Sequence, residues 1–321
     1  MKYVTLAPIS NREQTVKYFV IVNPTSGRGL GGRSIPQIES SLHNYGLDFT
    51  LVQTEGVWHA AELAEGAARD DYDVIVCASG DGTANEAING IMHARKDGHT
   101  KSAFTVLGIG TGNDFAGGTG IPTNLNDGLK ALNQNKRKKI DIGFVKGGDY
   151  PEGRYFGNGI GVGFDAAVGN EAVKVRWTRG LPAYLIGVIK TVFLYYNPPQ
   201  VEIILDDQET IRQVSLMISV MNGRRMGGGF QMAPESQPDD GFFDLCIAET
   251  ASKGRILSMI PHFIKGTQAS LPEIQMKRAK TVSIKALDMT FPAHADGEFI
   301  CLSGSHLTLE LLPKELEIVC A

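Results

Sequence analysis

The feature that most constrains the fold is an alternation of short apolar runs and amphipathic stretches in the first half of the chain. Four nearly continuous apolar runs are typical of parallel strands covered on both faces, at residues 18–22, 49–52, 74–77 and 104–109. Helical stretches lie between them, near residues 34–45, 58–69 and 84–94. Strands that alternate with helices form βαβ units, so the sequence predicts a doubly wound α/β domain at the N-terminal end.

Beyond Gly147 the pattern changes to short strands separated by Gly, Pro and Asp turns, at residues 201–205, 213–221, 242–248, 281–284 and 306–312. A helix near 124–134 and a strand near 139–145 complete the first half, and the second half has helical spans only near 173–195 and 253–265. We therefore predict an α/β domain over residues 1–146 and a mainly antiparallel β domain over residues 147–321.

The charge balance argues against nucleic acid as a partner, because 31 basic and 35 acidic residues give a net charge of −4. Residues 1–16 lack a basic region followed by an apolar one, so no secretory signal is expected. The apolar stretch 181–196 is interrupted by Lys190 and is shorter than the roughly 20 residues that a membrane span needs. Four scattered cysteines without a C-x-x-C pair indicate reduced thiols. These features predict a cytoplasmic protein that is soluble or peripherally attached to a membrane.

Three glycine-rich loops each follow an apolar strand, at residues 23–27, 79–83 and 110–114. In a parallel sheet such loops emerge at the same edge, beyond the carboxyl ends of the strands, where open α/β sheets bind ligands. Their convergence therefore predicts a binding site.

The middle loop carries the most specific signal. Thr83 and Glu86 have the spacing of a capping box, which places the loop against a helix N-terminus. The amide groups and positive dipole of a helix start suit a phosphate, and Gly80 and Gly82 let the backbone approach closely. A carboxylate would not bind phosphate, so Asp81 is expected to engage Mg²⁺ carried by a nucleotide. The alternative is a capped turn in which Asp81 is only a turn residue.

The first loop also approaches two other motifs. The glycines at 27, 29 and 32 match a dinucleotide-binding fingerprint with Glu55 as its acid, although residues 23–26 separate the strand from the first glycine. The same stretch approaches a P-loop but has Arg33 where lysine would contact phosphate. Dinucleotide binding is a minor alternative.

Together the loops resemble the catalytic domain of the diacylglycerol kinase family, which includes bacterial lipid kinases and the sphingosine and ceramide kinases. The matching motifs are Val22-Asn-Pro-Thr-Ser-Gly27, Ser79-Gly-Asp-Gly-Thr-Ala-Asn-Glu86, Gly110-Thr-Gly-Asn-Asp-Phe115 and Asp296-Gly-Glu298. Their order and spacing fit over nearly the whole chain. The middle motif by itself is also similar to one in NAD kinases and phosphofructokinases, and Ser79 stands where bacterial members often have glycine, which loosens the substrate class.

The resemblance implies an N-terminal nucleotide-binding domain and a C-terminal lipid-substrate domain. It implies an ATP site formed by Asn23, Thr54, Ser79, Gly80, Asp81, Gly82, Thr83, Ala84, Asn85 and Thr111. It also implies a structural Mg²⁺ held by Gln237, Asp240 and Phe242, in a stretch whose Asp-Asp-Gly sequence equally suits a simple turn.

Phosphoryl transfer needs charge neutralisation at the γ-phosphate and a carboxylate that accepts the hydroxyl proton. The resemblance assigns the second role to the turn of Asp296 and Glu298, which the sequence does not separate; the alternative is a polar hairpin tip. With Asp81, these acids are the predicted catalytic residues of an ATP-dependent kinase acting on a lipid hydroxyl such as that of diacylglycerol. A soluble-metabolite kinase of the NAD kinase type and a non-catalytic nucleotide- or lipid-binding regulator are the alternatives.

The expected partner is a membrane lipid met by peripheral contact, and a homodimer is compatible with the sequence. Two segments could reach anionic lipid: Lys136–Lys139, which also suits a solvated loop, and Arg176–Arg179 with Trp177, which also suits the start of a core helix.

Overall fold

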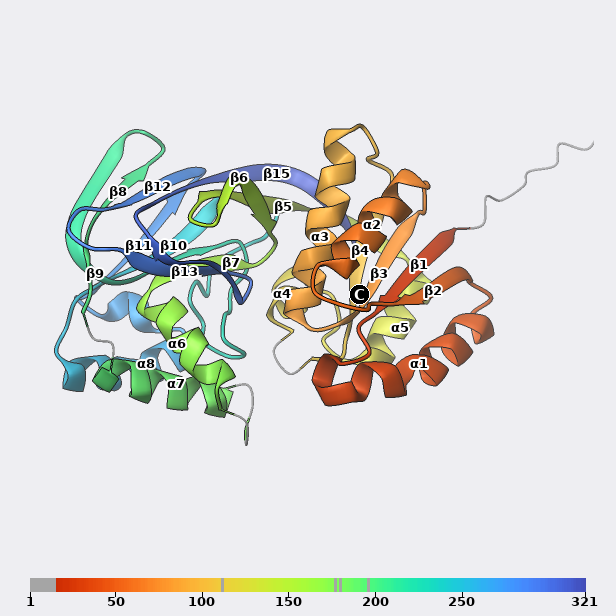
Figure 1. Ribbon diagram of the computed structural model, residues 1–321, viewed down its shortest axis with the longest axis horizontal. Coiled ribbons are helices and arrows are strands. Elements are labelled where there is room, and N and C mark those ends of the chain that lie inside the picture. Colours follow the sequence, from red (N-terminus) through yellow and green to blue (C-terminus); the bar gives the residue numbers. More distant parts are fainter. Residues whose placement is uncertain (1–15, 111–112, 176–177, 179–180, 195–196) are drawn as a thin grey trace, which may run out of the picture.

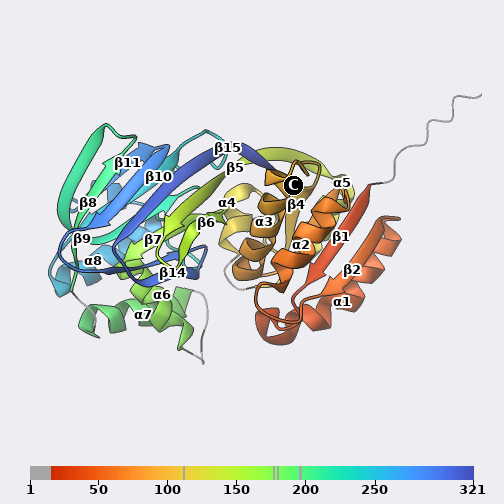
Figure 2. The same cartoon turned by 45° about the horizontal axis from the view of Figure 1, so that its top comes forward.

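The computed structural model describes residues 16–110, 113–175, 178, 181–194 and 197–321. The chain forms two halves that lie side by side, and two long strands connect them (Figure 1). Turning the molecule shows the helices of the N-terminal half on both faces of its sheet (Figure 2). The predicted α/β domain followed by a mainly antiparallel β domain is confirmed.

The N-terminal half is built on four parallel strands in the order β2-β1-β3-β4. The strands are β1 (Lys17–Val22), β2 (Asp48–Gln53), β3 (Val74–Ser79) and β4 (Ala103–Gly108). The helices are α1 (Ser26–Asn44), α2 (His59–Arg69), α3 (Asp81–Lys96), α4 (Asp114–Thr119) and α5 (Leu125–Gln134). Every residue of β3 is buried, as expected for a central strand that is covered on both faces. One apolar core includes side chains of α2 and α3, and a second includes side chains of α1 and α5.

The C-terminal half is mainly antiparallel. Its strands are β6 (Tyr150–Phe156), β7 (Gly159–Gly163), β8 (Gln200–Leu205), β9 (Glu209–Met221), β10 (Phe243–Glu249), β11 (Ile274–Ala279), β12 (Thr281–Ala286), β13 (Phe291–Ala295) and β14 (Glu298–Gly304). Its helices are α6 (Phe164–Val173), α7 (Leu181–Leu194) and α8 (Lys253–Lys265), with a short 3-10 turn η1 (Gln268–Ser270). The three helices lie together along one side of this half (Figure 1).

The helical span predicted near residues 173–195 contains α7, whereas α6 before it was not predicted. The structure has α6, which ends at Val173, and α7, which begins at Leu181. The residues before 173 are apolar and rich in glycine, a composition typical of strands and turns, so the sequence did not indicate α6. Within the described residues, no helix has both the length and the apolar character to span a membrane.

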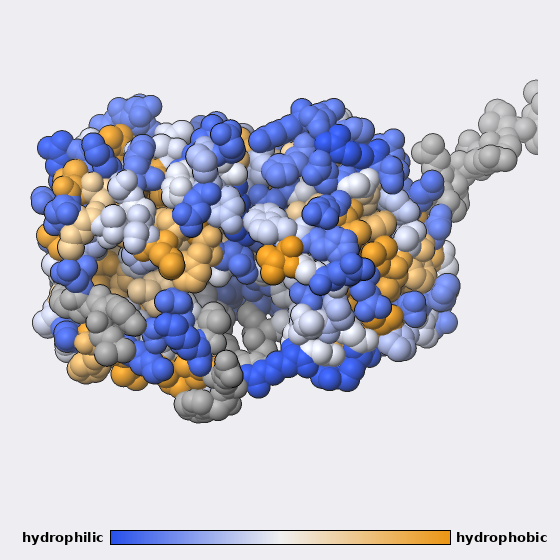
Figure 3. All heavy atoms as spheres, viewed as in Figure 1, coloured by the Kyte–Doolittle hydropathy of each residue, from blue (hydrophilic) through white to orange (hydrophobic). Residues whose placement is uncertain are grey.

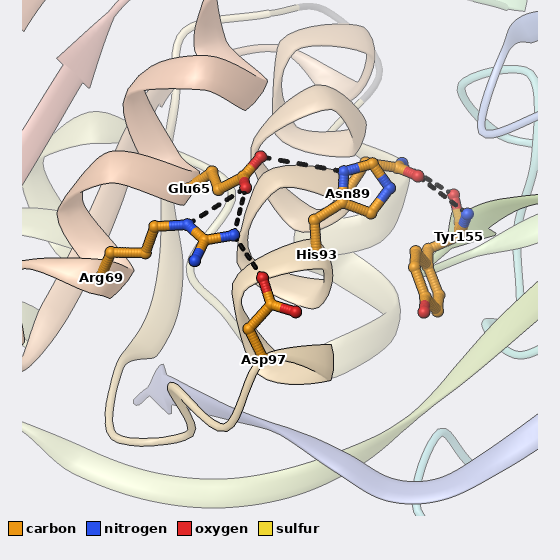
Figure 4. Close-up of polar contacts among 6 residues, drawn as sticks. All are labelled: Glu65, Arg69, Asn89, His93, Asp97 and Tyr155. Carbon is orange, nitrogen blue, oxygen red and sulfur yellow. Dashed lines mark hydrogen bonds and ion pairs between the residues drawn. The ribbon is translucent and has the colours of Figure 1, made fainter.

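Helix α3 is held on two sides by polar side chains (Figure 4). Arg69 donates to Glu65 in α2 at 2.8 Å and to Asp97, the residue that follows α3, at 2.5 Å. On the other side, the Asn89 amide donates to the Tyr155 carbonyl oxygen at 3.0 Å and accepts from the Tyr155 amide at 2.8 Å. Asn89 therefore fixes α3 to β6 of the C-terminal half.

Two long strands, β5 (Lys136–Gly147) and β15 (His306–Cys320), pair with each other and run across both halves (Figure 1). Leu309 of β15 packs in the C-terminal core, whereas Leu316 and Ile318 pack in an N-terminal core. Ile318 also pairs with Phe104 of β4. The predicted boundary between residues 146 and 147 falls at the end of β5 and stays a prediction.

Candidate active site

The three glycine-rich loops lie together at the carboxyl ends of β1, β3 and β4, joined by side-chain contacts. Asn23, directly after β1, donates from Nδ2 to Thr83 Oγ1 at 2.8 Å. Asp81, after β3, accepts from the amides of Asp114 and Phe115, after β4, at 3.2 Å each. The sequence-predicted edge of the sheet is thus one connected surface.

The predicted capping box is wrong in detail. Helix α3 begins at Asp81 with Gly80 as its N-cap, so Thr83 lies in the first turn and accepts a hydrogen bond from Asn23 instead of capping the helix. Glu86 accepts from the backbone of Trp58 and Ala60. The helix therefore starts at the loop itself, which brings its positive end to the loop glycines.

A cavity of about 550 Å³ opens between the two halves at this edge, where the space-filling view shows the surface hollowed (Figure 3). From the N-terminal half it is lined by Gly27, Arg28, Gly80, Asp81, Gly82, Gly110 and Asp114. From the C-terminal half the polar lining residues are Asn158, Thr178, Tyr184, His294, Asp296 and Glu298.

Not all predicted ATP contacts line this cavity. Ser79 and Ala84 are buried, and Thr54 is 9% exposed. Asn85 is 1% exposed, and its Oδ1 accepts from Arg154. Thr111 lies outside the described residues, and the ATP contacts that the resemblance implies stay predictions.

Asp81 and Asp114 form a pair of poorly solvated carboxylates. Burial, reinforced by the charge of Asp114, raises the pKa of Asp81 to about 6. Burial also raises the pKa of Asp114, although its Oδ2 accepts from the Gly228 amide at 2.8 Å. Carboxyl groups with raised pKa values in a cavity mark a candidate functional site. Asp114 was not among the predicted site residues. Its position in the Gly110–Phe115 motif was the feature of the sequence that could have identified it.

Asp296 is buried and accepts four hydrogen bonds. Its Oδ2 accepts from Asn85 Nδ2 and the Gly157 amide at 2.8 Å each, and its Oδ1 accepts from the Asn158 and Gly159 amides at 2.9 Å each. A carboxylate with two donors on each oxygen has its four acceptor positions filled, so it is not free to accept a hydrogen bond from a substrate hydroxyl. Asp296 therefore holds the two halves and the β6–β7 turn in place.

Glu298 has a different environment, because its side chain is exposed and lines the cavity. A β-carbon added at Gly82 would come within 2.6 Å of Glu298 Oε1, so the carboxylate lies against the first turn of α3. The structure thus separates the two acids that the sequence left equivalent.

The structural Mg²⁺ site that the resemblance implies, with the Asp240 carboxylate and carbonyls of Gln237 and Phe242, stays a prediction. Asp240 Oδ1 accepts from the Phe242 amide at 3.1 Å, and Oδ2 forms an ion pair with Arg278. The Arg278 guanidinium also lies 4.6 Å from the Phe242 ring centroid and 3.4 Å from Asp244 Oδ1. Arg278 thus pairs with the one carboxylate of the expected site, and a metal there would have to displace it. Within the described parts of the chain, no cluster of three or more His, Cys, Asp or Glu could hold a metal.

Of the two basic segments, Lys136–Lys139 forms the start of β5 and pairs with β15. Its Arg137 forms an ion pair with Glu317 at 3.1 Å. The segment is therefore a strand, and not the solvated loop that was the alternative. Arg176, Trp177 and Arg179 lie outside the described residues.

The fold, in which an α/β half faces a β-rich half, is shared with solved structures of a diacylglycerol kinase and of an NADH kinase. Residues 17–145 match the diacylglycerol kinase catalytic domain, and residues 158–320 match the YegS C-terminal NAD kinase beta sandwich-like domain. The chain belongs to the diacylglycerol kinase catalytic-domain family.

Relatives support this assignment over most of the chain. A diacylglycerol kinase of Mycobacterium tuberculosis is 26% identical over 96% of both chains, and one of Staphylococcus saprophyticus is 29% identical over 87% of this chain and 88% of its own. The crystal structure of a diacylglycerol kinase from Bacillus anthracis has a TM-score of 0.71 at 20% identity and covers 97% of this chain and 98% of its own. Yeast NADH kinase complexed with NADH has a TM-score of 0.51 at 11% identity, over 96% and 84% of the two chains.

Proposed function

We propose that this protein is an ATP-dependent lipid kinase that transfers the γ-phosphate to a hydroxyl of a lipid such as diacylglycerol. The observation that carries the proposal is the position of Glu298, an exposed carboxylate set against the first turn of α3 at Gly82. A phosphate at that helix start would lie beside a group able to accept the proton of an attacking hydroxyl.

The nucleotide end of the cavity is formed by the N-terminal half. The start of α3 supplies amide groups for the phosphates, and Gly27, Gly80 and Gly110 line the cavity without side-chain bulk. Asp81 and Asp114 would bind the Mg²⁺ that accompanies ATP, because Mg²⁺ prefers carboxylate oxygens. Their roles are to position the nucleotide complex, while Glu298 receives the proton of the acceptor.

The C-terminal half forms the acceptor end. A second groove of about 260 Å³ shares Ala166 and Phe299 with the main cavity and continues past Phe164 and Leu302. Leu302 is 65% exposed. An apolar groove that leads from the surface to Glu298 suits a lipid chain, which we propose the protein meets by peripheral contact with a membrane.

The test is mass spectrometry of products after the protein, ATP and Mg²⁺ are incubated with a total lipid extract. A phosphorylated lipid that disappears in the Glu298→Gln variant is the expected result. The likeness to NADH kinase gives the competing activity, so NAD and NADH are tested as acceptors in parallel. Phosphorylation of these water-soluble acceptors, with none of any lipid, would replace the proposal by a soluble-metabolite kinase.

A further inference from the structure

Arg154 of β6 has no role in the mechanism above, although it lies where the two halves meet. The residue is 3% exposed. Its Nε and Nη2 both donate to Asn85 Oδ1 on α3, at 3.1 Å and 2.6 Å. A buried guanidinium of the C-terminal half is thus anchored on the helix whose first turn lies against Glu298.

Two aromatic rings also contact this guanidinium. Arg154 Cζ lies 4.6 Å from the Trp58 ring centroid and 5.1 Å from the Tyr150 ring centroid. Nη1 donates to the Tyr150 hydroxyl at 2.9 Å. An aromatic ring within about 6 Å attracts a cation, and a planar guanidinium can stack on the ring as an ammonium cannot. Since Trp58 belongs to the N-terminal half, two groups of that half hold Arg154, a ring and an amide.

Trp58 is itself fixed in place for this contact. It directly precedes α2 and has a φ of 66°, which is uncommon for a residue other than glycine. The carboxylate of Glu86, the neighbour of Asn85 on α3, accepts from the backbone of Trp58 and Ala60. Two adjacent residues of the Ser79–Glu86 motif therefore support Arg154, Asn85 directly and Glu86 through Trp58.

The Asn85 amide links Arg154 to Asp296. Its Oδ1 accepts from the guanidinium and, at 3.3 Å, from Asn89 Nδ2. Its Nδ2 faces the other way and donates to Asp296 Oδ2 at 2.8 Å. Among the described residues that donate to Asp296, Asn85 alone belongs to the N-terminal half, because the others are the amides of residues 157–159. The Asn85 side chain is thus a direct bond between α3 and the turn that joins β13 to β14.

We propose that Arg154 is a positioning residue for phosphoryl transfer, which acts through Asn85 to fix the distance between the first turn of α3 and Glu298. The inference rests on the proposed lipid kinase function and adds a residue to it. Glu298 follows Asp296 by two positions, at the start of β14, so a shift of Asp296 relative to Asn85 would move the Glu298 carboxylate relative to the helix start. Displacement of a reacting group by about 1 Å can cost on the order of 10² in rate.

Substitution of Arg154 tests this role through the division of the effect between kcat and KM. Arg154→Met keeps an unbranched side chain but makes no hydrogen bond to Asn85, so kcat for lipid phosphorylation should fall by roughly tenfold or more. The KM for ATP should change by no more than about twofold, because the proposed nucleotide contacts belong to the N-terminal half. Arg154→Lys, with one ammonium in place of two parallel donors, should restore only part of the rate.

Two further variants separate position from stability. Trp58→Leu removes a ring from Arg154 but leaves both hydrogen bonds to Asn85, so kcat should fall in the same sense but by less. Arg95→Met is the matched control, because Arg95 is partly buried in the last turn of the same helix and donates to the Thr100 carbonyl oxygen at 3.0 Å. Its loss should lower the melting temperature and leave kcat in place. Melting temperatures are measured for every variant, and if Arg154→Met does not fold, Arg154→Lys and Trp58→Leu decide the test.

A double-mutant cycle assigns the effect to the amide. If Arg154 acts through Asn85, Arg154→Met should add little to the loss of kcat that Asn85→Ala already causes. Residues that act independently would instead give losses that multiply.

The outcomes are distinct. Unchanged kcat in the Arg154 variants and in Trp58→Leu, an equal fall of kcat in Arg95→Met, or losses that multiply in the cycle would overturn the positioning role and leave the lipid kinase intact. If the unmodified protein phosphorylates no lipid, the proposed function fails, and the positioning role in lipid turnover fails with it.

Discussion

The Glu298 carboxylate lies so close to the α3 backbone that a β-carbon at Gly82 would come within 2.6 Å of its Oε1. The two residues are more than 200 positions apart and belong to different halves, so their approach depends on how the halves are docked. Asn85 and Asp296 join the halves nearby through a buried hydrogen bond of 2.8 Å.

The first prediction concerns Glu298. Glu298→Gln keeps the size of the side chain but removes its ability to accept a proton, so kcat should fall by roughly 10² or more with little change in ATP affinity. Gly82→Ala should also lower kcat, because the new methyl group displaces the carboxylate. Gly66→Ala in α2, where an added β-carbon meets nothing within 4 Å, is the control and should leave kcat in place. Normal turnover in Glu298→Gln would remove the carboxylate from the mechanism.

The second prediction is that Asp296 matters mainly to stability. Asp296→Asn replaces one oxygen by an NH₂ group that faces donors, so two buried donors lose their acceptor, at a cost of about 1–3 kcal/mol each. Urea unfolding should show a loss of about 2–5 kcal/mol, whereas exposed Glu298→Gln should stay within about 0.5 kcal/mol of the parent. Equal stability of the two variants would contradict the structural role of Asp296.

The third prediction uses the raised pKa of Asp81, which is about 6. A carboxyl group with a raised pKa stabilises the folded state when protonated, so its contribution is lost as pH rises from its ordinary value of 3.8 through about 6. Asp81→Asn mimics the protonated form. The variant should match the parent in stability below pH 4 and exceed it at pH 8, by about 3 kcal/mol at most.

The same substitution should abolish activity, since a neutral amide cannot replace the carboxylate beside Mg²⁺. Melting temperatures between pH 4 and 8 provide the measurement, with the exposed Asp70→Asn as control. A difference that does not change with pH would show that Asp81 ionises as an ordinary carboxyl group.

The fourth prediction is that Arg278, which pairs with Asp240, stabilises the fold at the position where the structural Mg²⁺ was expected. Because the guanidinium already pairs with Asp240, the melting temperature without nucleotide should be the same in Mg²⁺ and in a chelator. Arg278→Met leaves Asp240 and Asp244 without their cation, so stability should fall by about 1–3 kcal/mol and Mg²⁺ should restore part of it.

Arg212→Met is the matched control, because Arg212 pairs with Glu202 on an exposed strand surface and should contribute little. A melting temperature that rises with Mg²⁺ in the unmodified protein would show that the metal binds despite Arg278.

Much of the fold could be predicted from the sequence because its signals are local. The four apolar strands and the helix near residues 253–265 follow from periodicity and their flanking turns. The different environments of Asp296 and Glu298 could not be predicted from the sequence. They differ because backbone amides donate to Asp296, and these amides come close to it only in the folded chain. The pairing of Asp240 with Arg278 joins positions 38 apart and has no local signal.

The path of β15 has a consequence for how the molecule forms. Leu316 and Ile318 complete a core whose other members begin at Ile21, and Thr105 in β4 donates to the Val319 carbonyl oxygen at 2.9 Å. Contacts of such long sequence separation form late and slow the search for the native state. A growing chain that has already produced the three glycine-rich loops therefore still lacks part of the N-terminal core until residues 316–320 have been synthesised. Removing only those residues would therefore destabilise the N-terminal half, where the three loops lie.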